Sequence, residues 1–446
     1  MSRRFRPLEP LKPVIPKHRV PPWGQGGGRR DETTGSCRGP DMVMRIAVVG
    51  GGLTGCLIAL EYAERGHQVM LFDREASLLS RASAANEGKI HLGYCYAADD
   101  GFRTAERLIE DALWFRPILE RWMTPETFDT CVCEPFYYTV PTDSALSEER
   151  ITAHFARVDI HIRERKRHLG LAYLGQDETP DFTPCQPDHA ADAPFFLTQE
   201  RGVWPIGIAE RIDGSVRAHP RIELRLASRV HRIEPSGSKW RVGLTEPTGA
   251  TEGPFDIVVN AAWAERRSID RRSGHSLPGS WFTRYKFGVI VQQASLLLAG
   301  DVPRNTTATS GPFGDCVHYP ANDSLYCSWY PVGMCFSTMD DELGQRPILP
   351  QPPETLMRGT FEGCATFAPV FRRLAALPSP LPARIVGDFI IAKGRSDIDD
   401  PGSELHRRSD HGVRELAPGY WSIETGKYTS APRCAIECVD ASLGRA

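Results

Sequence analysis

The residue pattern with the clearest chemical meaning is Gly50-Gly51-Gly52-Leu53-Thr54-Gly55, a G-x-G-x-x-G sequence. In such a pattern the first glycine permits a tight turn, and the missing side chain at Gly52 lets the backbone approach a pyrophosphate. Gly55 lets a helix pack closely on the preceding strand. Asp73 follows 18 residues beyond Gly55, near the spacing at which a carboxylate accepts hydrogen bonds from ribose hydroxyls. The combination predicts a dinucleotide site.

The segments around these glycines have the order that such a site requires. Residues 45–49 form a short apolar run rich in β-branched side chains, residues 53–64 carry apolar residues at helical spacing, and residues 69–72 form a second apolar run. The helix would begin at the glycines and offer its free N–H groups to phosphates. This is a Rossmann-type strand-helix-strand unit. Arg74, next to Asp73, could reach a 2′-phosphate, so the unit alone leaves NADP open.

Three further segments indicate which dinucleotide is bound. Residues 83–94, Ser-Ala-Ala-Asn-Glu-Gly-Lys-Ile-His-Leu-Gly-Tyr, resemble the second motif of the D-amino-acid oxidase superfamily of FAD-dependent oxidoreductases, which lies beside the flavin ring. Residues 256–262 look like the superfamily's strand that returns to the FAD domain, with Trp263 in place of the usual glycine. Residues 419–429 are similar to its last FAD contact, a glycine turn before a helix that directs N–H groups at the flavin N1–C2=O edge. The resemblance implies FAD.

The glycine pattern and the resemblance together assign the cofactor contacts to the N-terminal unit, the second motif, the returning strand and the C-terminal turn. The predicted FAD-binding residues are Gly50, Gly51, Gly52, Leu53, Thr54, Gly55, Asp73, Arg74, Asn86, Gly88, Lys89, Ile90, Val230, Ala261, Gly426, Lys427, Tyr428 and Thr429.

His91, in the second motif, is the first catalytic candidate. An imidazole can take a proton from an alcohol or an ammonium group near neutral pH. Two other interpretations stay open for His91: a structural hydrogen bond within its loop, and a covalent histidyl–flavin link of the kind that some superfamily members carry.

Arg395 is the second candidate, because the resemblance places a strand ending in a Gly-Arg pair here and the sequence has Gly394-Arg395. A guanidinium matches a carboxylate at two points. We therefore expect Arg395 to bind a small-molecule substrate that carries a carboxylate. The alternative is a surface ion pair with one of the acidic residues between 397 and 400.

The order of these segments predicts an α/β fold with two discontinuous domains. Residues 44–115, 200–275 and 385–446 would form the Rossmann-type FAD-binding domain with a parallel sheet. Residues 116–199 and 276–384 would form an α+β substrate domain on a mixed antiparallel sheet.

The resemblance also implies a function, that of an FAD-dependent oxidase or dehydrogenase. Such an enzyme transfers hydride from a C–N or C–O bond of a small amino or hydroxy acid to flavin N5. Oxygen or another electron acceptor is the final oxidant. The alternatives are an NAD(P)-dependent Rossmann dehydrogenase and a flavoprotein whose FAD is structural or sensory.

Charge, apolar stretches and cysteine spacing indicate which other classes of protein the sequence does not resemble. The formal net charge of the 446 residues is only −3, which does not suggest nucleic-acid binding. The apolar stretch at 287–300 is interrupted by two glutamines and falls short of the ~20 residues that span a bilayer, so we expect no membrane span and a cytoplasmic protein. The cysteines lack paired C-x-x-C spacings, so no metal site is predicted. Residues 1–41, rich in Pro, Gly and Arg, are expected to be a disordered extension or to precede the true start.

Overall fold

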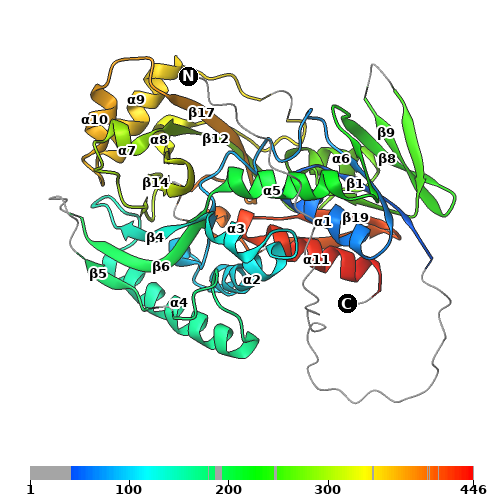
Figure 1. Ribbon diagram of the computed structural model, residues 1–446, viewed down its shortest axis with the longest axis horizontal. Coiled ribbons are helices and arrows are strands. Elements are labelled where there is room, and N and C mark those ends of the chain that lie inside the picture. The colour runs from blue at the N-terminus through cyan, green and yellow to red at the C-terminus, as the bar shows by residue number, and fades with distance from the viewer. Residues whose placement is uncertain are drawn as a thin grey trace, which may run out of the picture.

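The computed structural model describes residues 42–178, 180–185, 193–245, 249–343, 346–398, 400, 402–409 and 411–444. The expectation for residues 1–41 lies outside this described part. Two large sheets and a small one carry the architecture. In Figure 1 the sheet that contains β1 and β19 lies at the right, and the sheet that contains β4, β6, β12 and β17 lies at the left.

The first sheet has six strands in the order β18-β19-β11-β1-β2-β7. Its strands β1, β2, β7, β11 and β19 run parallel, and β18 is antiparallel to β19 at one edge. This is the parallel sheet that the strand-helix-strand pattern predicts. The bounds are β1 Arg45–Val49, β2 Gln68–Phe72, β7 Ile222–Arg225, β11 Ile257–Asn260, β18 Gly412–Ala417 and β19 Tyr420–Glu424.

Helices and a small sheet cover the first sheet. Helix α1 begins at the glycine turn after β1, is buried over most of its length, and packs against α5 and α11. The small sheet packs near β1 and β11. The elements are α1 Leu53–Glu64, α5 Pro205–Ala218, η2 Trp263–Glu265, α6 Arg266–Arg272, η4 Glu404–His406, η5 Tyr428–Ser430, α11 Ala431–Ser442, β8 Val230–Ser236, β9 Lys239–Leu244 and β10 Thr251–Phe255.

The second sheet is mixed and largely antiparallel, as expected, with one parallel pair between β13 and β4. Its core path is β16-β12-β15-β14-β13-β4-β6-β3, with β17 beside β12 and β5 beside β6. The bounds are β3 Lys89–Ile90, β4 Val132–Thr139, β5 Thr183–Cys185, β6 Phe195–Val203, β12 Trp281–Gln292, β13 Thr306–Ala308, β14 Gly314–Tyr319, β15 Ser324–Trp329, β16 Met334–Thr338 and β17 Ala383–Lys393.

Helices α9 and α10 lie above the second sheet in Figure 1, and α4 lies below it. Helices α4 and α9 pack their apolar faces against the strands, and α10 packs on α9. The opposite faces are exposed. The remaining elements are η1 Tyr94–Tyr96, α2 Arg103–Leu119, α3 Pro125–Asp129, α4 Glu148–Leu169, α7 Ala294–Leu297, η3 Pro320–Asn322, α8 Tyr330–Gly333, α9 Pro353–Cys364 and α10 Phe371–Ala376.

Three strands differ from the sequence-based division of the chain. Strand β3 and residues 200–203 of β6 were expected in the first domain but pair with each other in the second sheet. Residues 385–393 were expected in the first domain, but β17 pairs with β12 along its whole length and therefore belongs to the second sheet. The physical reason is its long apolar face, which joins the core of that sheet. The other domain boundaries stay predictions.

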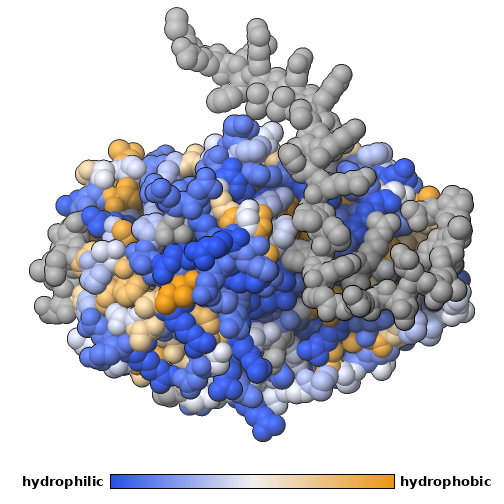
Figure 2. Space-filling view, turned by 90° about the horizontal axis from the view of Figure 1, so that it is seen from below, coloured by the Kyte–Doolittle hydropathy of each residue, from blue (hydrophilic) through white to orange (hydrophobic). Residues whose placement is uncertain are grey.

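One face of the molecule is seen in Figure 2. Polar residues dominate the face in Figure 2, and apolar residues form only scattered patches on it. Within the described ranges, every helix is too short or too polar to cross a membrane. The same residues hold no cluster of potential metal ligands.

Candidate active site

A large cavity lies between the first and second sheets. Its wall brings together the turn after β1, the end of β2, the second motif, strands β12 and β14, and the C-terminal turn. Most of the predicted cofactor residues line it: Gly50, Gly52, Leu53, Thr54, Asp73, Arg74, Asn86, Lys89, Val230, Ala261, Gly426, Lys427 and Tyr428, together with His91. The predicted residues that do not line it are Gly51, Gly55, Gly88, Ile90 and Thr429.

Gly50 and Gly55, the first and last glycines of the G-x-G-x-x-G pattern, are required by the protein itself. Gly50 has a φ of +106°, and a Cβ there would lie 2.5 Å from the carbonyl oxygen of Ala261. A Cβ on Gly55 would lie 1.8 Å from the carbonyl oxygen of Gly50. Both positions are therefore fixed by the fold of the chain itself.

Gly52 is different, because the protein would tolerate a side chain there. Its φ is −76°, which any residue adopts, and among the described residues a Cβ would meet only the Ser83 hydroxyl oxygen, at 3.2 Å. Gly52 also caps α1 without a side-chain hydrogen bond. The space beside it opens into the cavity. The Leu53 N–H donates to Ser83 Oγ at 2.9 Å, and the next N–H groups of α1 can receive phosphates. The residues present therefore fit FAD.

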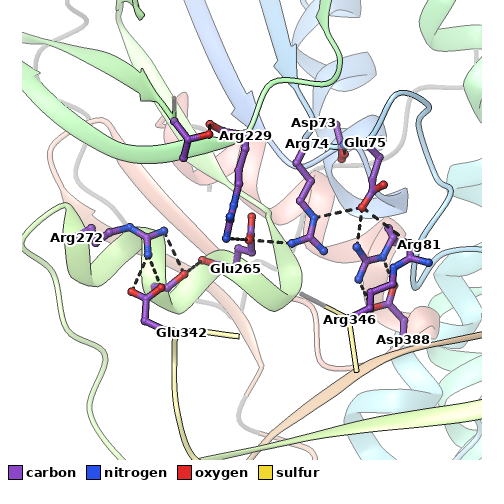
Figure 3. A network of polar contacts seen from close by, with 12 residues as sticks. Asp73, Arg74, Glu75, Arg81, Arg229, Glu265, Arg272, Glu342, Arg346 and Asp388 are labelled. Atoms are coloured by element: carbon purple, nitrogen blue, oxygen red, sulfur yellow. Dashed lines mark hydrogen bonds and ion pairs between the residues drawn. The ribbon is translucent and has the colours of Figure 1, made fainter. Parts of the chain in front are cut away.

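Asp73 and Arg74 at the end of β2 decide between FAD and NADP. Asp73 Oδ2 accepts from Gly51 N at 2.6 Å, and burial raises the pKa of the Asp73 carboxyl. Arg74 Nη1 lies 2.8 Å from Glu265 Oε1, and Arg74 Nε lies 3.4 Å from Glu75 Oε1 (Figure 3). Glu265 also pairs with Arg229 at 2.6 Å and Glu75 with Arg81 at 2.6 Å. A 2′-phosphate would therefore have to take Arg74 out of this ion-pair network, which disfavours NADP.

The second motif is a loop whose polar residues shape its backbone. Asn86 Oδ1 accepts from Gly88 N at 2.7 Å. Gly88 has a φ of +65°, and a Cβ there would lie 1.9 Å from the Val203 carbonyl oxygen. The loop leads into β3, where Lys89 is buried, donates to the Thr307 hydroxyl and lies 4.4 Å above the Phe136 ring. Asn86 and Gly88 thus position Lys89 and the residues that follow it.

His91 is buried at the bottom of the cavity. Its backbone N–H donates to Thr429 Oγ1 at 2.9 Å, which ties the second motif to the C-terminal turn. Its Nδ1 lies 3.7 Å from Cys95 Sγ and 3.6 Å from Glu200 Oε1. Burial and Lys427 act to lower the pKa of His91, but Cys95 and Glu200 outweigh them and raise it.

The C-terminal turn places a cation in the cavity. Gly426 has a φ of +71°, and Lys427 Nζ lies 5.6 Å above the Tyr96 ring. Burial, together with the nearby Arg408, lowers the pKa of Lys427 to about 8. The turn is held by Ser430, whose hydroxyl donates to the buried Asp111 at 2.6 Å.

Three buried cations of the cavity wall were not predicted from sequence. Arg284 and Lys286 lie on β12, two positions apart, and Arg408 precedes β18. Arg284 Nη1 pairs with Asp397 Oδ1 at 2.7 Å, while in the described part of the chain its Nε is buried without a hydrogen-bond partner. Lys286 Nζ lies 3.7 Å from Glu87 Oε2. For Arg284 and Lys286, the sequence feature that could have indicated them is a pair of basic residues two positions apart in an apolar run.

Arg408 differs from the other two cations. It is 8% exposed, and its Nη1 donates to the Ile391 carbonyl oxygen at 3.0 Å. Among the described residues it forms no ion pair. Burial, with Arg284 nearby, lowers the pKa of Arg408. A buried guanidinium without a carboxylate is costly unless an anion completes the site.

Arg395 does not reach this cavity. Its side chain is exposed, and its Nε donates to Ser280 Oγ at 3.1 Å. It follows the end of β17, where the chain leaves the sheet, while Arg408 returns toward the cavity beyond η4. The carboxylate-binding role predicted for Arg395 therefore has a better placed candidate in Arg408.

Trp263, which replaces the usual glycine after the returning strand, lies in the cavity wall with a φ of +47°. That is the left-handed region that favours glycine. Its indole N–H donates to the Phe389 carbonyl oxygen of β17 at 2.9 Å. Trp263 thus joins the first sheet to the second.

Comparisons with known proteins agree with this geometry. A family model described as FAD dependent oxidoreductase matches residues 45–324. The structure of glycine oxidase from Geobacillus kaustophilus aligns with a TM-score of 0.60 at 16% identity, over 91% of this chain and 96% of that one. L-α-glycerophosphate oxidase from Mycoplasma pneumoniae, solved with FAD bound, aligns with a TM-score of 0.56 at 15% identity, over 90% and 95%. The FAD-dependent monooxygenase FPY4 of Fusarium mangiferae is 34% identical over 84 residues, 19% of this chain and only 22% of that relative.

Proposed function

This chain belongs to the DAO family of FAD dependent oxidoreductases, and on that premise we propose that it oxidises the C–N or C–O bond of a small amino or hydroxy acid. Bound FAD supplies the acceptor for the hydride that leaves the substrate carbon. The side chains of the cavity have three tasks: to bind the acid, to orient its C–H bond, and to take the proton of its amine or hydroxyl.

Arg408 is the proposed carboxylate ligand, and its missing partner is the observation that carries the proposal. Its guanidinium keeps donors unused beyond the one that reaches the Ile391 carbonyl oxygen. A guanidinium offers two parallel N–H groups to one carboxylate, which fixes the orientation of the acid as well as its position. Arg284, with its buried unsatisfied Nε, adds positive potential on the same side.

His91 is the proposed proton acceptor. It lines the cavity, and its pKa is raised above the usual value of 6.5. An imidazole is an effective base near neutral pH. The neutral form is the active one, so the rate should fall as the pH drops through that pKa. The interpretations of His91 as a structural residue or as a covalent flavin link remain outcomes of the test.

The charge of the cavity restricts the reacting group. Lys89, Lys286 and Lys427 all line it, so a substrate ammonium group would share the cavity with several cations. Glu87 and Asp315 line the cavity too and offset part of this charge, so the cavity favours the neutral form of an amine, whereas a hydroxyl is neutral already. Both amino and hydroxy acids remain within the proposal, with oxygen or another electron acceptor completing the cycle.

The test is an anaerobic screen of amino and hydroxy acids for loss of flavin absorbance in the purified protein. A reducing acid supports the proposal, and its esters should fail because they lack the carboxylate. His91→Asn should keep its FAD and slow reduction by about 10²-fold or more. If no amino or hydroxy acid reduces the flavin, while dithionite does, the proposal is wrong. Flavin that stays attached on acid precipitation of wild type, but not of His91→Asn, would instead indicate the covalent link.

A further inference from the structure

Glu200 on β6 is a fully buried carboxylate directly behind His91. Its exposed fraction is 0%, and its Oε1 lies 3.6 Å from His91 Nδ1. Two further donors hold it: Leu92 N reaches Oε2 at 2.6 Å, and Tyr138 Oη reaches Oε1 at 2.5 Å. The side chain is therefore fixed in one orientation, with one oxygen directed at the imidazole.

The two ring nitrogens of His91 have different surroundings. Nδ1 faces Glu200 and the Cys95 thiol. Within the described residues no hydrogen bond reaches Nε2, and the His91 side chain lines the cavity. The Nδ1–Glu200 distance of 3.6 Å is that of an ion pair rather than a hydrogen bond. Because a carboxylate only accepts, its negative charge favours the proton of the neutral ring on Nδ1, which faces it. Nε2 is then the nitrogen that has a free lone pair.

We propose that Glu200 is a positioning residue for His91: it holds the Nδ1–H tautomer and the ring orientation, so that Nε2 can take a proton from the substrate hydroxyl or amine. This inference rests on the proposed function, in which His91 is the proton acceptor. In the step itself, the substrate O–H or N–H bond breaks, a new N–H bond forms at Nε2, and the positive charge of the ring is stabilised by the Glu200 carboxylate.

The charged and titratable groups around His91 come from four elements. Glu200 lies on β6, Cys95 on η1, Glu87 in the second motif and Lys427 in the C-terminal turn, and the Tyr96 ring lies 6.0 Å from the imidazole. Burial and Lys427 oppose protonation of the imidazole, and Cys95 and Glu200 favour it. Removal of the Glu200 charge should therefore lower the pKa of His91.

Glu200→Gln is the informative substitution because it keeps the volume of the side chain. The amide oxygen can still accept from Leu92 N, while the NH₂ group faces Nδ1 and Tyr138 Oη. An NH₂ group donates to Nδ1, which forces the proton onto Nε2 and removes the lone pair that catalysis needs. A merely structural carboxylate would have no such effect on the ring.

The matched control is Asp159→Asn. Asp159 is also buried, at 1% exposure, accepts from the Tyr94 hydroxyl and from Phe182 N at 2.8 Å, and forms no contact with His91. Its neighbourhood is comparable, because the Tyr94 and Tyr138 rings lie 5.9 Å apart. A general effect of removing buried charge from this region should appear equally in both variants.

Two measurements on the FAD-loaded proteins test the proposal. The first is the pH profile of kcat/KM with a reducing acid. The second, which needs no substrate, is the NMR titration of protein labelled with ¹³C at Cε1 of histidine, with His91→Asn used for assignment. For Glu200→Gln we expect kcat/KM to fall at least about 10-fold at neutral pH. The pKa of His91 and the acid limb of the profile should fall by about one unit.

The outcomes separate the two proposals. If Asp159→Asn leaves both readouts at wild-type values while Glu200→Gln shifts them, the positioning role is supported. If Glu200→Gln leaves the His91 titration unchanged, or if both variants lower it equally, the inference is overturned. If no acid reduces the wild-type flavin, the proposed function fails, and the NMR titration still decides whether Glu200 controls the protonation of His91.

Discussion

Arg81 and Asp388 form a two-point ion pair that joins the two sides of the cavity. Arg81 Nε lies 2.9 Å from Asp388 Oδ2, and Arg81 Nη2 lies 3.1 Å from Asp388 Oδ1, across 307 positions of sequence (Figure 3). Arg81 precedes the second motif, and Asp388 lies on β17. Both line the cavity. Glu75 is a second partner of Arg81, at 2.6 Å.

Asp388→Asn should weaken both the fold and the retention of FAD. The amide cannot replace two charge-assisted bonds, so we expect the free energy of unfolding to fall by about 1.5–3 kcal/mol and FAD to dissociate faster. Denaturant unfolding and the recovery of flavin fluorescence measure these two effects. Asp213→Asn, which breaks a half-exposed pair with Arg217, is the control and should cost at most about 1 kcal/mol. Equal losses in both variants would contradict the prediction.

Gly52→Val should give a folded protein without FAD. The backbone at Gly52 accepts any residue, and among the described residues a Cβ there meets only the Ser83 hydroxyl, at 3.2 Å. A small shift of Ser83 relieves that contact, so the added side chain should obstruct chiefly the cofactor phosphates. The ratio of flavin absorbance to protein, with circular dichroism of the apoprotein, tests this. Gly214→Val adds the same volume at an open position on α5 and should keep its flavin. Stoichiometric FAD in Gly52→Val would exclude a phosphate site at this turn.

The charge of Lys427 should make the midpoint potential of the flavin depend on pH. Its pKa of about 8 means that it is cationic at neutral pH and loses its charge as the pH rises through 8. A cation favours an anionic reduced ring and therefore raises the midpoint potential. Lys427→Met should lower that potential at pH 7 by about 30 mV, the equivalent of about 1.4 kcal/mol for two electrons.

The wild-type potential should also fall with an additional inflection near pH 8 that Lys427→Met lacks. Lys239→Met, on β9 outside the cavity, controls for the loss of a lysine and should keep the wild-type profile. Parallel curves for wild type and Lys427→Met would show that Lys427 does not act on the ring. Potentiometric dye titration measures all three proteins.

The parts of the site that could be predicted are the turns and loops whose backbone conformation binds or positions other groups. The glycine turn after β1, the Asn86–Gly88 loop and the Gly426 turn are each specified by a few adjacent residues with special φ values or local hydrogen bonds. Such constraints are local, so they are visible in sequence. The parallel sheet followed from the same local patterns.

The side chains that complete the cavity could not be predicted, because distant pairing brings them there. Glu200 reaches His91 through the pairing of β6 with β3, and no motif surrounds it in sequence. Arg284 approaches Arg408 because β12 pairs with β17. Arg395 was expected in the cavity for the opposite reason: its place in sequence is right, but the chain turns outward at the end of β17.

Arg408 and Arg395 give the most direct test of how the acid is bound. Arg408→Met should keep its FAD but lower kcat/KM for the reducing acid by about 10²-fold, the equivalent of about 3 kcal/mol. The substitution removes the guanidinium that would pair with the substrate carboxylate and leaves that carboxylate buried without a partner. Arg408→Lys should recover only part of this loss, since an ammonium group fixes the position of a carboxylate but not its orientation.

Arg395→Met is the matched control, because it removes a guanidinium from the same stretch of chain. Its side chain is exposed and bonded to Ser280, so kcat/KM should stay within about twofold of wild type. The split between kcat and KM adds a second criterion. Hydride transfer tolerates little misorientation of the C–H bond, so loss of a two-point ligand should lower kcat as well as raise KM. If Arg395→Met lost activity and Arg408→Met kept it, the substrate carboxylate would have to lie outside the cavity wall, and the sequence-based assignment of Arg395 would be the better one.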